Sequence, residues 1–501
     1  MRIFCTYLCD YKDRGDYYLS LMPYGITSIA AYLEKEGHEV ILANLSSYGY
    51  IKGAELTVQL NPEAVAISIF SFNRTDSFKY IKELKKLNKK IVIIAGGQHP
   101  TFLHDEIIAR YPEIDFIITG EGELALKELI DTSFKNSPVI LNAERIKDIN
   151  TVPSPSSFGG RMIGINPAEQ YKFIITSRGC PATCAYCSSP NFWKKKVTFR
   201  NPELIVDELK YLQNKYGIIY FSIRDDNFSL KKDRVMEFCR ILDKSNLNMM
   251  WNCQARVDTI DEEMLIAMKK CGLEHIQFGV ESGSEKILKI YDKNINKEKI
   301  QAAAALVRKV GVYLSFYIMA GMIGETESDI LATRKLISKT QPHDVIISPV
   351  AFYPGTKIYT DSQKQGLIDD KKWFTSQDNG LYVTPKKNHI KYIRELAAHS
   401  LNVSSDAEYI PVDFSVHSSI TGKSCWMNYL IEADYYIKKN KIKKVTNIYN
   451  SMIKNFPDNK WGYLRLSEII INDAPEKALK LLKKDNLFIL YYKKQYNLIG
   501  G

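Results

Sequence analysis

The chain lacks an apolar run long enough to cross a membrane. No stretch of about 18 consecutive apolar residues occurs in it, whereas a spanning helix needs about 20. The segment Met1 to Cys5 enters a strand-like pattern directly and lacks the layout of a secretion signal. We therefore expect a cytoplasmic protein with no membrane partner.

The sequence also lacks a dominant charge and a disulfide-like cysteine pattern. The net charge of +11 is spread along the chain, and only short runs such as Lys194 to Lys196 stand out. This mild excess permits an anionic partner without requiring one, so we do not expect a nucleic-acid partner. Nine cysteines in a cytoplasmic chain of 501 residues favour thiols and metal ligation over disulfides.

Residues 1–150 alternate apolar strand patterns with helical ones. Near-continuous apolar strands separated by helices predict a doubly wound, Rossmann-like parallel sheet covered on both faces. Ligands of such sheets bind at the carboxyl ends of the strands. The predicted strands are 3–7, 39–42, 64–68, 91–95 and 116–118, with a helix over 24–36.

The rest of the chain predicts a barrel and a helical tail. Residues 151–170 are rich in Pro, Ser and Gly and are typical of a linker. Six strand–helix units over 171–360 predict a partial (β/α)6 barrel, with a barrel extension over 361–400. Aromatic helical patterns over 401–501 loosely match tetratricopeptide repeats, and we expect this tail to pack on the barrel. The predicted barrel strands are 172–177, 218–224, 247–252, 275–280, 313–319 and 345–351.

Three cysteines lie close together after the first barrel strand. Cys180, Cys184 and Cys187 occur within eight residues, and thiolates at this spacing can hold one soft metal centre. In a [4Fe–4S] cluster, three cysteines leave one iron open to another ligand. A zinc site needs a fourth protein ligand, and no Cys, His or Asp occurs in the 15 residues after Cys187.

The Cys-x3-Cys-x2-Cys spacing, with Tyr186 before the third cysteine, resembles the radical S-adenosylmethionine (SAM) superfamily. Further segments match that superfamily in order, at the ends of the later strands. Residues 1–150 resemble a cobalamin (B12)-binding domain, so the chain looks like the subgroup that carries this domain ahead of the barrel. The matching segments are 23–33, Gly96 to His99, Thr119 to Glu123, 221–228, 251–258, 278–284, 317–326 and 352–356.

The resemblance implies that the open iron binds the amino and carboxylate groups of SAM. Reductive cleavage of a C–S bond would then give a 5′-deoxyadenosyl radical. The implied contacts are Tyr186 near the adenine, Asp225 and Asp226 at the ammonium group, Glu281 and Ser282 at the ribose or amino acid end, Asn296 at the ribose, Arg308 at the carboxylate, and Gly321 and Gly324 beside the adenine.

Simpler structural roles compete with several of these assignments. Asp225 or Asp226 could cap the turn before Phe228, and Arg308 could be a solvated cation at a helix end. We expect Arg256 and Asp258 to form a structural ion pair.

The cobalamin assignment depends on a modified motif. Histidine-ligated cobalamin domains carry Asp-x-His-x-x-Gly after the first strand, and this chain has Asp10, Lys12 and Gly15 there. A lysine, normally charged at neutral pH, is a poor metal ligand. We therefore expect cobalamin to bind without this histidine. The candidate contacts are Gly96, Gly97, His99, Gly120 and Glu121, although His99 could be a hydrogen-bonded loop residue and the Gly120 turn a simple helix start.

The sequence predicts a radical SAM enzyme that methylates an unactivated carbon with cobalamin. The alternatives are a cobalamin-independent cyclisation, rearrangement, epimerisation or oxidation, or a redox-sensing iron–sulfur protein. A tRNA methylthiotransferase needs a second cysteine set, and the N-terminal domain has only Cys5 and Cys9. We expect a small-molecule or peptide substrate and an external one-electron reductant of the flavodoxin or ferredoxin type. The sequence identifies no catalytic residue.

Overall fold

The computed structural model describes residues 1–9, 21–135, 137–376, 378, 380–383, 386–471 and 474–482. The chain divides into two compact units. The first unit contains Met1–Tyr171, Ser177–Arg200 and Ala351–Val383, and the second contains Lys172–Thr176, Asn201–Val350 and the chain from Thr384 onwards.

The first unit contains a parallel sheet with the strand order β6-β5-β4-β3-β1-β2-β7. It confirms the predicted Rossmann-like fold, and the sequence analysis missed only the short strands β6 and β7. The strands are β1 (Arg2–Tyr7), β2 (Glu39–Asn44), β3 (Ala64–Ser68), β4 (Val92–Gly96), β5 (Phe116–Thr119), β6 (Ile140–Asn142) and β7 (Arg161–Ile163).

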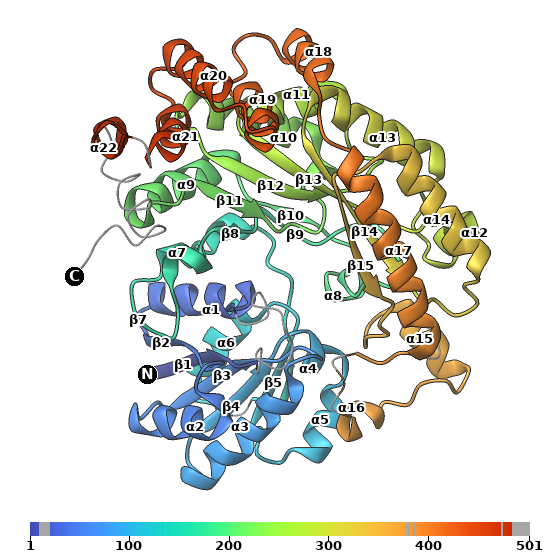
Figure 1. Cartoon of the computed structure of the whole chain (residues 1–501). Helices are drawn as coiled ribbons and strands as arrows, with labels where there is room; N and C mark the ends of the chain where they lie inside the picture. The colour runs from blue at the N-terminus through green and yellow to red at the C-terminus, as the bar shows by residue number, and fades with distance from the viewer. Residues whose placement is uncertain are drawn as a thin grey trace. The chain divides into compact units, whose positions relative to one another are not determined.

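Helices cover both faces of this sheet. Every residue of β3 is buried, as expected for a strand between two helical layers. Helix α1 packs with α6 through a shared apolar core, and α2 packs with α3 on the other face (Figure 1). The helices are α1 (Tyr24–Lys35), α2 (Gly49–Gln59), α3 (Arg74–Leu87), α4 (Gln98–Phe102), α5 (His104–Arg110) and α6 (Gly122–Asp131).

The segment 151–170, which the sequence presents as a linker, folds onto this sheet. Its strand β7 pairs in parallel with β2. At Gly160, just before β7, an added Cβ would lie 2.8 Å from the carbonyl oxygen of Val40. Only a residue without a side chain allows the two backbones to approach this closely.

Two later segments complete the first unit. Ser177–Arg200 contains β9 (Ser177–Arg178), α8 (Ser189–Phe192) and β10 (Thr198–Phe199), and Ala351–Val383 contains α15 (Lys357–Lys364) and α16 (Lys372–Thr375). The expectation of a barrel extension over 361–400 is therefore wrong for its first part, because residues up to 383 pack in the unit of the N-terminal sheet.

Arg74 explains why the late segment packs there. Its side chain is 1% exposed and donates hydrogen bonds to the carbonyl oxygens of Trp373 (2.7 Å), Ser376 (2.6 Å) and Asp378 (2.8 Å). The guanidinium also lies 4.8 Å from the centre of the Trp373 ring. The cation satisfies carbonyls that would otherwise lack donors in a buried segment.

The second unit is an open parallel sheet with the order β15-β14-β13-β12-β11-β8. Strands β8 and β15 lie at opposite edges, which confirms the partial barrel. The strands are β8 (Phe173–Ile174), β11 (Tyr220–Ile223), β12 (Met250–Ala255), β13 (Leu273–Glu281), β14 (Tyr313–Ala320) and β15 (Asp344–Pro349). The helices are α9 (Pro202–Tyr216), α10 (Lys232–Lys244), α11 (Glu262–Lys270), α12 (Glu285–Ile290), α13 (Lys297–Val310), α14 (Glu327–Thr340) and α17 (Lys386–Asp406).

The C-terminal helices pack on the barrel, as expected. Trp426, Leu430 and Trp461 share one apolar cluster with Ile219 and Met250, at the starts of barrel strands. The Trp461 indole N–H donates to the Asn248 carbonyl (2.6 Å). These helices are α18 (Pro411–Thr421), α19 (Met427–Lys438), α20 (Ile442–Asn455), α21 (Lys460–Ile470) and α22 (Pro475–Leu482).

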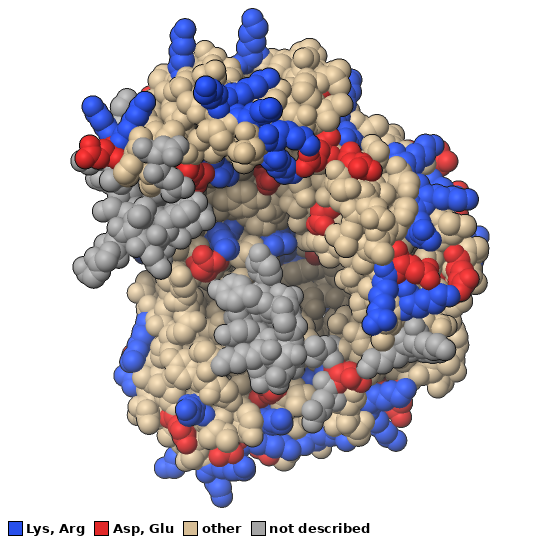
Figure 2. Space-filling model, viewed as in Figure 1, with Lys and Arg blue, Asp and Glu red and all other residues tan. Residues whose placement is uncertain are grey.

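The distribution of charge and apolar residues agrees with the sequence. Figure 2 shows lysine and arginine side chains mixed with acidic ones over the visible face, with several of these basic side chains over the C-terminal helices. Exposed lysines lie at the end of α19, in the turn after it and in the first turn of α20, at positions 438, 439, 441, 443 and 444. Across the described residues, none of the helices combines the length and apolarity that a membrane span requires.

Candidate functional site

The cysteine loop rises from a short two-stranded ribbon in the first unit. Strand β9 pairs antiparallel with β10, with Arg178 opposite Thr198. The next residue, Gly179, has φ +99°, and an added Cβ would lie 2.2 Å from the Lys196 carbonyl oxygen. This position therefore requires glycine, and the ribbon fixes where the loop starts.

The three cysteines are held in a compact turn. Cys180 and Cys184 are 9% and 8% exposed, and Cys187 is half-buried. The Cys187 N–H donates to the Cys184 carbonyl (3.1 Å), and the Ser189 N–H donates to the Cys187 sulfur (3.4 Å). Such N–H donors stabilise thiolates and tune the potential of iron–sulfur clusters. Tyr186 is half-buried beside them.

The geometry gives no support to a zinc site. Among the described residues, no group of three or more His, Cys, Asp or Glu side chains converges to hold one metal ion. A four-iron cluster binds each thiolate at a different iron, so its ligands lie farther apart than those of a single ion. The donor set of three thiolates fits such a cluster, and cluster ligation by Cys180, Cys184 and Cys187 stays a prediction.

In the second unit, strand β11 ends in the run Asp225, Asp226 and Asn227. The Asp225 carboxylate is 1% exposed and accepts hydrogen bonds from the Thr176 backbone N–H (2.6 Å) and hydroxyl (2.5 Å). It thus fixes the chain just after β8, while Asp226 is exposed. Neither carboxylate is a helix cap, and their contact with the SAM ammonium group stays a prediction.

Asn227 lies in the matching segment 221–228, and the sequence analysis assigned it no role. It is 2% exposed, and its side-chain amide nitrogen has no hydrogen-bond partner among the described residues. Its oxygen accepts from the Ser229 hydroxyl (3.1 Å). A buried unpaired donor at a strand end costs free energy unless a ligand or water binds it, so it suits an anionic ligand group.

Glu281 ends strand β13, and Ser282 follows it. Glu281 has φ +68°, an unusual conformation for a residue with a side chain that is common at ligand sites. Its carboxylate forms a buried ion pair with Lys293 (2.9 Å). The Ser282 hydroxyl lies 3.2 Å from that of Thr333, so both predicted contacts already have protein partners at this edge.

Asn296 and Arg308 lie at opposite ends of α13. The Asn296 side chain is exposed and caps the helix by accepting from the Lys299 N–H (3.0 Å). Arg308 lies in the last turn, at the edge where strands begin, and donates to the carbonyls of Gln341 and Ala407 (both 2.9 Å). The prediction that Arg308 binds SAM is wrong, because α13 carries it away from the carboxyl ends of the strands.

Gly321 and Gly324 follow β14, and both have positive φ values, +94° and +78°. An added Cβ at Gly321 would lie 2.1 Å from the ring of His389, whereas Gly324 has open space around it. Gly324 alone therefore leaves room for a ligand. His389, on α17, closes over Gly321 and was not found from the sequence, because no local pattern links residues this far apart.

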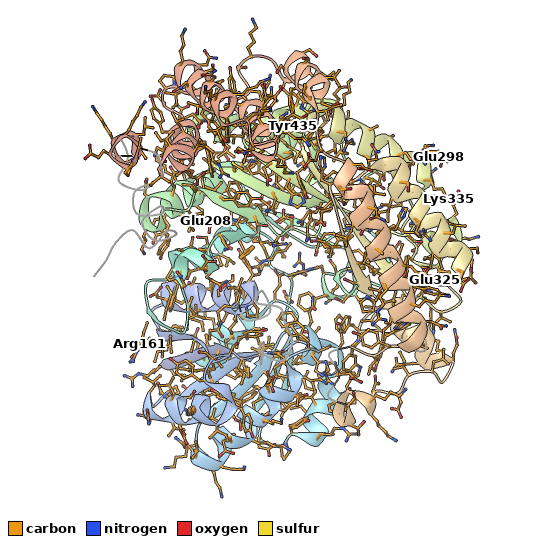
Figure 3. All side chains as sticks on the ribbon, in the orientation of Figure 1. Arg161, Glu208, Glu298, Glu325, Lys335 and Tyr435 are labelled. Atoms are coloured by element: carbon orange, nitrogen blue, oxygen red, sulfur yellow. The ribbon has the colours of Figure 1, made fainter. Side chains whose placement is uncertain are left out.

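Glu325, labelled in Figure 3, is a half-buried residue at this edge. Its Oε2 accepts from the backbone N–H groups of Gly321 (2.5 Å) and Met322 (3.2 Å). Its Oε1 is buried without a hydrogen-bond partner among the described residues. Burial raises the pKa of Glu325 to about 7. An unpaired carboxylate oxygen and the unpaired Asn227 amide fit an amino-acid ligand such as the methionine part of SAM.

One expected ion pair is present. The Arg256 guanidinium bonds both oxygens of Asp258 (2.9 Å each), which confirms its structural role. A two-point pair between neighbouring residues holds the end of β12 in a fixed conformation.

The first unit contains the candidate cobalamin contacts. Gly96 and Gly97 end β4, and an added Cβ at Gly97 would lie 2.6 Å from the Ile69 carbonyl oxygen. Phe70 and Phe72, after β3, are half-buried and stack with ring centres 5.3 Å apart. Glycine backbones and flat apolar side chains at a carboxyl edge fit a large, flat macrocycle. Asp10, Lys12 and Gly15 lie outside the described residues.

Two predicted cobalamin contacts already have protein partners. His99 is 1% exposed. Its ring lies 3.0 Å from the Ser71 hydroxyl and packs against Trp373. Burial, together with the nearby Arg74 cation, lowers the pKa of His99 to about 3. The two carboxylate oxygens of Glu121 form ion pairs, one with Arg178 (2.8 Å) and the other with Arg145 (2.7 Å). The buried His99 Nε2 has no hydrogen-bond partner among the described residues, so a contact of His99 or Glu121 with cobalamin stays a prediction. Gly120 lies at the end of β5 with φ +79°.

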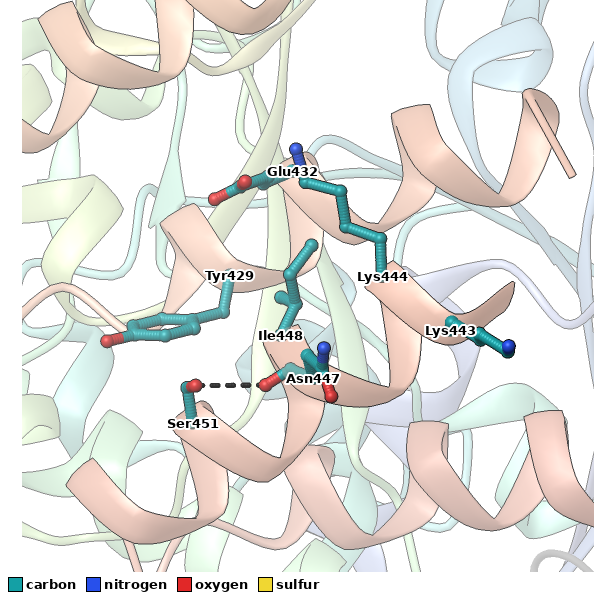
Figure 4. A pocket seen from close by; sticks show the side chains of 7 residues that line it. All are labelled: Tyr429, Glu432, Lys443, Lys444, Asn447, Ile448 and Ser451. Carbon is teal, nitrogen blue, oxygen red and sulfur yellow. Dashed lines mark hydrogen bonds between the residues drawn. The ribbon is translucent and has the colours of Figure 1, made fainter. Parts of the chain in front are cut away.

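Two surface cavities lie apart from these residues. The first, of about 580 Å³, lies between α19 and α20 (Figure 4). The second, of about 530 Å³, lies near the starts of β1 and β2, beside Arg161. Neither is lined by a predicted cofactor contact. The first is lined by Tyr429, Glu432, Lys443, Lys444, Asn447, Ile448 and Ser451.

Family models match both units. Residues 174–337 match the radical SAM superfamily, and residues 14–130 match the B12 binding domain. The chain is 27% identical to an uncharacterized methyltransferase of Pyrococcus horikoshii over 70% of this chain and 80% of that protein. It is 26% identical to the anaerobic magnesium-protoporphyrin IX monomethyl ester cyclase of Rubrivivax gelatinosus over 64% of this chain and 62% of the cyclase.

A solved structure shares the fold of the whole chain. The cobalamin-dependent SAM radical enzyme OxsB, with aqua-cobalamin and SAM bound, is 15% identical with a TM-score of 0.63. The match covers 100% of this chain and 81% of OxsB. The chain therefore belongs to the radical SAM superfamily, in the subgroup that carries a B12-binding domain ahead of the radical SAM domain.

Proposed function

We propose that this radical SAM enzyme transfers a methyl group to an unactivated carbon with the help of cobalamin. The observation that carries the proposal is that the cysteine loop folds within the same compact unit as the B12-binding sheet. One unit thus brings together the chain's candidate iron ligands and its candidate corrin contacts. When bound, the cluster supplies an electron to SAM, and cobalamin supplies a transferable methyl group.

The chain's own residues would bind and orient these groups. Cys180, Cys184 and Cys187 would hold three irons through thiolates, with the Ser189 N–H stabilising the charge on Cys187. Glu325 and Asn227 would meet the charged amino-acid end of SAM, because their buried polar atoms lack protein partners among the described residues. Phe70 and Phe72 would pack against the corrin ring.

The test uses the purified full chain, with its cluster reconstituted without oxygen and supplied with hydroxocobalamin. Reduction by dithionite in the presence of SAM should release 5′-deoxyadenosine, and the protein should retain corrinoid absorbance after desalting. Cys184→Ser should lose iron and SAM cleavage. A chain that contains the cluster, retains no corrinoid and cleaves SAM equally well without cobalamin contradicts the proposal.

A second candidate function follows from the similarity to the Rubrivivax cyclase, which shows that proteins of this kind are not confined to methyl transfer. Here the same radical chemistry would cyclise or oxidise a small-molecule substrate. SAM with a trideuterated methyl group separates the two functions once a substrate is found. A mass increase in the product supports methylation, whereas loss of hydrogen without labelling supports cyclisation or oxidation. An external reductant of the flavodoxin or ferredoxin type would supply electrons in either case.

A further inference from the structure

We propose that Arg178 is a positioning residue that ties the cysteine loop to the B12-binding sheet. Arg178 lies on β9, two residues before Cys180, and its side chain reaches the turn between β5 and α6. The inference goes beyond the proposed function and rests on its assignment of Cys180, Cys184 and Cys187 as iron ligands.

The Arg178 guanidinium bridges two carboxylates. Its Nη1 lies 2.8 Å from Glu121 Oε1, and its Nη2 lies 2.6 Å from Glu123 Oε1. The Ser28 hydroxyl, on α1, donates to the same Glu123 oxygen (2.7 Å) and accepts from Arg178 (3.0 Å). The three charged side chains are 5%, 2% and 3% exposed, so solvent scarcely screens the network.

Arg145 completes the network. It pairs with the second oxygen of Glu121 (2.7 Å), and its guanidinium lies 4.5 Å from the centre of the Trp193 ring. Its Nη2 also lies 3.4 Å from the Arg178 carbonyl oxygen and from the Thr198 hydroxyl. Two arginines therefore balance two carboxylates and hold both strands of the ribbon that carries the loop.

Arg178 offsets the burial of Glu123. Burial alone would raise the pKa of Glu123, but the adjacent Arg178 outweighs it and the pKa is lowered. Well-packed apolar residues would often stabilise a buried site as well as an ion network does. The direct hydrogen bonds of Arg178 to Glu121, Glu123 and Ser28 instead favour one geometry, which suits a positioning role.

The arrangement restricts movement of the cysteine loop relative to the B12-binding sheet. Gly179 is confined by the Lys196 carbonyl, so movement of Arg178 moves Cys180. The turn that binds Arg178 starts at Gly120, one of the predicted corrin contacts. One turn thus borders the expected corrin site through its backbone and positions the cluster loop through its side chains. We expect the network to set the position of the cysteine loop on the B12-binding sheet.

The test compares Arg178→Lys and Glu123→Gln with the matched control Asp131→Asn. Asp131 lies on the same helix, α6, and pairs with Lys127 at the surface. Lysine keeps the charge of Arg178 but cannot bridge two carboxylates. Each full-length variant is reconstituted with iron and sulfide, and iron content, thermal unfolding, the spin-resonance spectrum of the reduced cluster with and without SAM, and SAM cleavage are measured.

We expect both network variants to bind as much iron as the wild type. Their spectra should show a broadened or lost response to SAM, and SAM cleavage should fall at least tenfold. Asp131→Asn should match the wild type. Glu123→Gln keeps the Arg178–Glu121 pair, so it remains informative if Arg178→Lys does not fold.

Two outcomes overturn the proposal in distinguishable ways. If the network variants carry full iron and respond to SAM as the wild type does, the network is only structural and the positioning role is refuted. If the wild type itself assembles no cluster, the proposed function fails, and this inference fails with it.

Discussion

Glu325 is a buried carboxylate that faces backbone N–H groups on one oxygen and no described partner on the other. Its pKa is raised to about 7, chiefly by burial. The folded state therefore holds a proton that the unfolded state releases at lower pH. Stability is greatest below the unfolded pKa and decreases as pH rises toward the folded pKa.

Glu325→Gln should remove this dependence. Between pH 5 and pH 8, the wild type should lose about 1–3 kcal/mol of unfolding free energy that the variant does not lose. Denaturant unfolding of both proteins without SAM measures this difference. Glu298→Gln, at an exposed position on α13 (Figure 3), is the control and should show no such change. An equal effect of Glu325→Gln at both pH values would refute the role of burial.

Residue types and spacing predict chemistry better than they predict contacts. The cysteine triplet and the strand-end residues were found because their motifs are local. The role of Arg178 was missed because its partner Glu121 lies 57 residues away. Arg308 was misplaced for a related reason, since a helix reverses direction and carries its last turn to the other edge of the sheet.

The position of the segment Ala351–Val383 depends on contacts with residues far away in the sequence. It enters the first unit through Arg74, which supplies hydrogen bonds to a stretch of backbone carbonyls. Strands β1 to β5 were predictable from their apolar runs. This segment was not, because its backbone is satisfied by one side chain far away in the sequence.

Arg74→Met should release this segment. The substitution removes the donors of several buried carbonyls, each costing about 1–3 kcal/mol when left unpaired. Limited proteolysis should then cleave near Trp373, and the first unit should lose several kcal/mol of stability. Arg110→Met is the matched control, because Arg110 is exposed and only stacks on Phe374 (4.6 Å). Equal cleavage in both variants would contradict the anchoring role.

At the scale of the whole molecule, the helical tail shares an apolar cluster with the starts of two barrel strands. Trp461 is 5% exposed and joins the tail to the loop before β12 through Asn248. The tail was expected to pack there because two repeats cannot bury an apolar face alone. The partners Ile219 and Met250 were not predictable, since either end of the barrel could have received it.

Trp461→Ala should destabilise the second unit by about 3–5 kcal/mol, because a large buried side chain is lost. Trp461→Phe keeps most of the ring and loses one hydrogen bond, so it should cost about 1 kcal/mol. Denaturant unfolding of both variants measures the difference. A loss confined to the tail, with an unchanged transition for the barrel, would show that the two fold separately.

Trp373 is translated long after Arg74, and this order affects folding during synthesis. Arg74 and Trp373 are 299 residues apart in sequence. At a translation rate of about 5–20 residues per second, Arg74 leaves the ribosome roughly 15–60 s before its partner exists. During this time, the Arg74 side chain lacks its carbonyl acceptors, and the apolar surface that Trp373 later covers is exposed to water. The nascent chain should therefore depend on chaperones until the barrel has been synthesised.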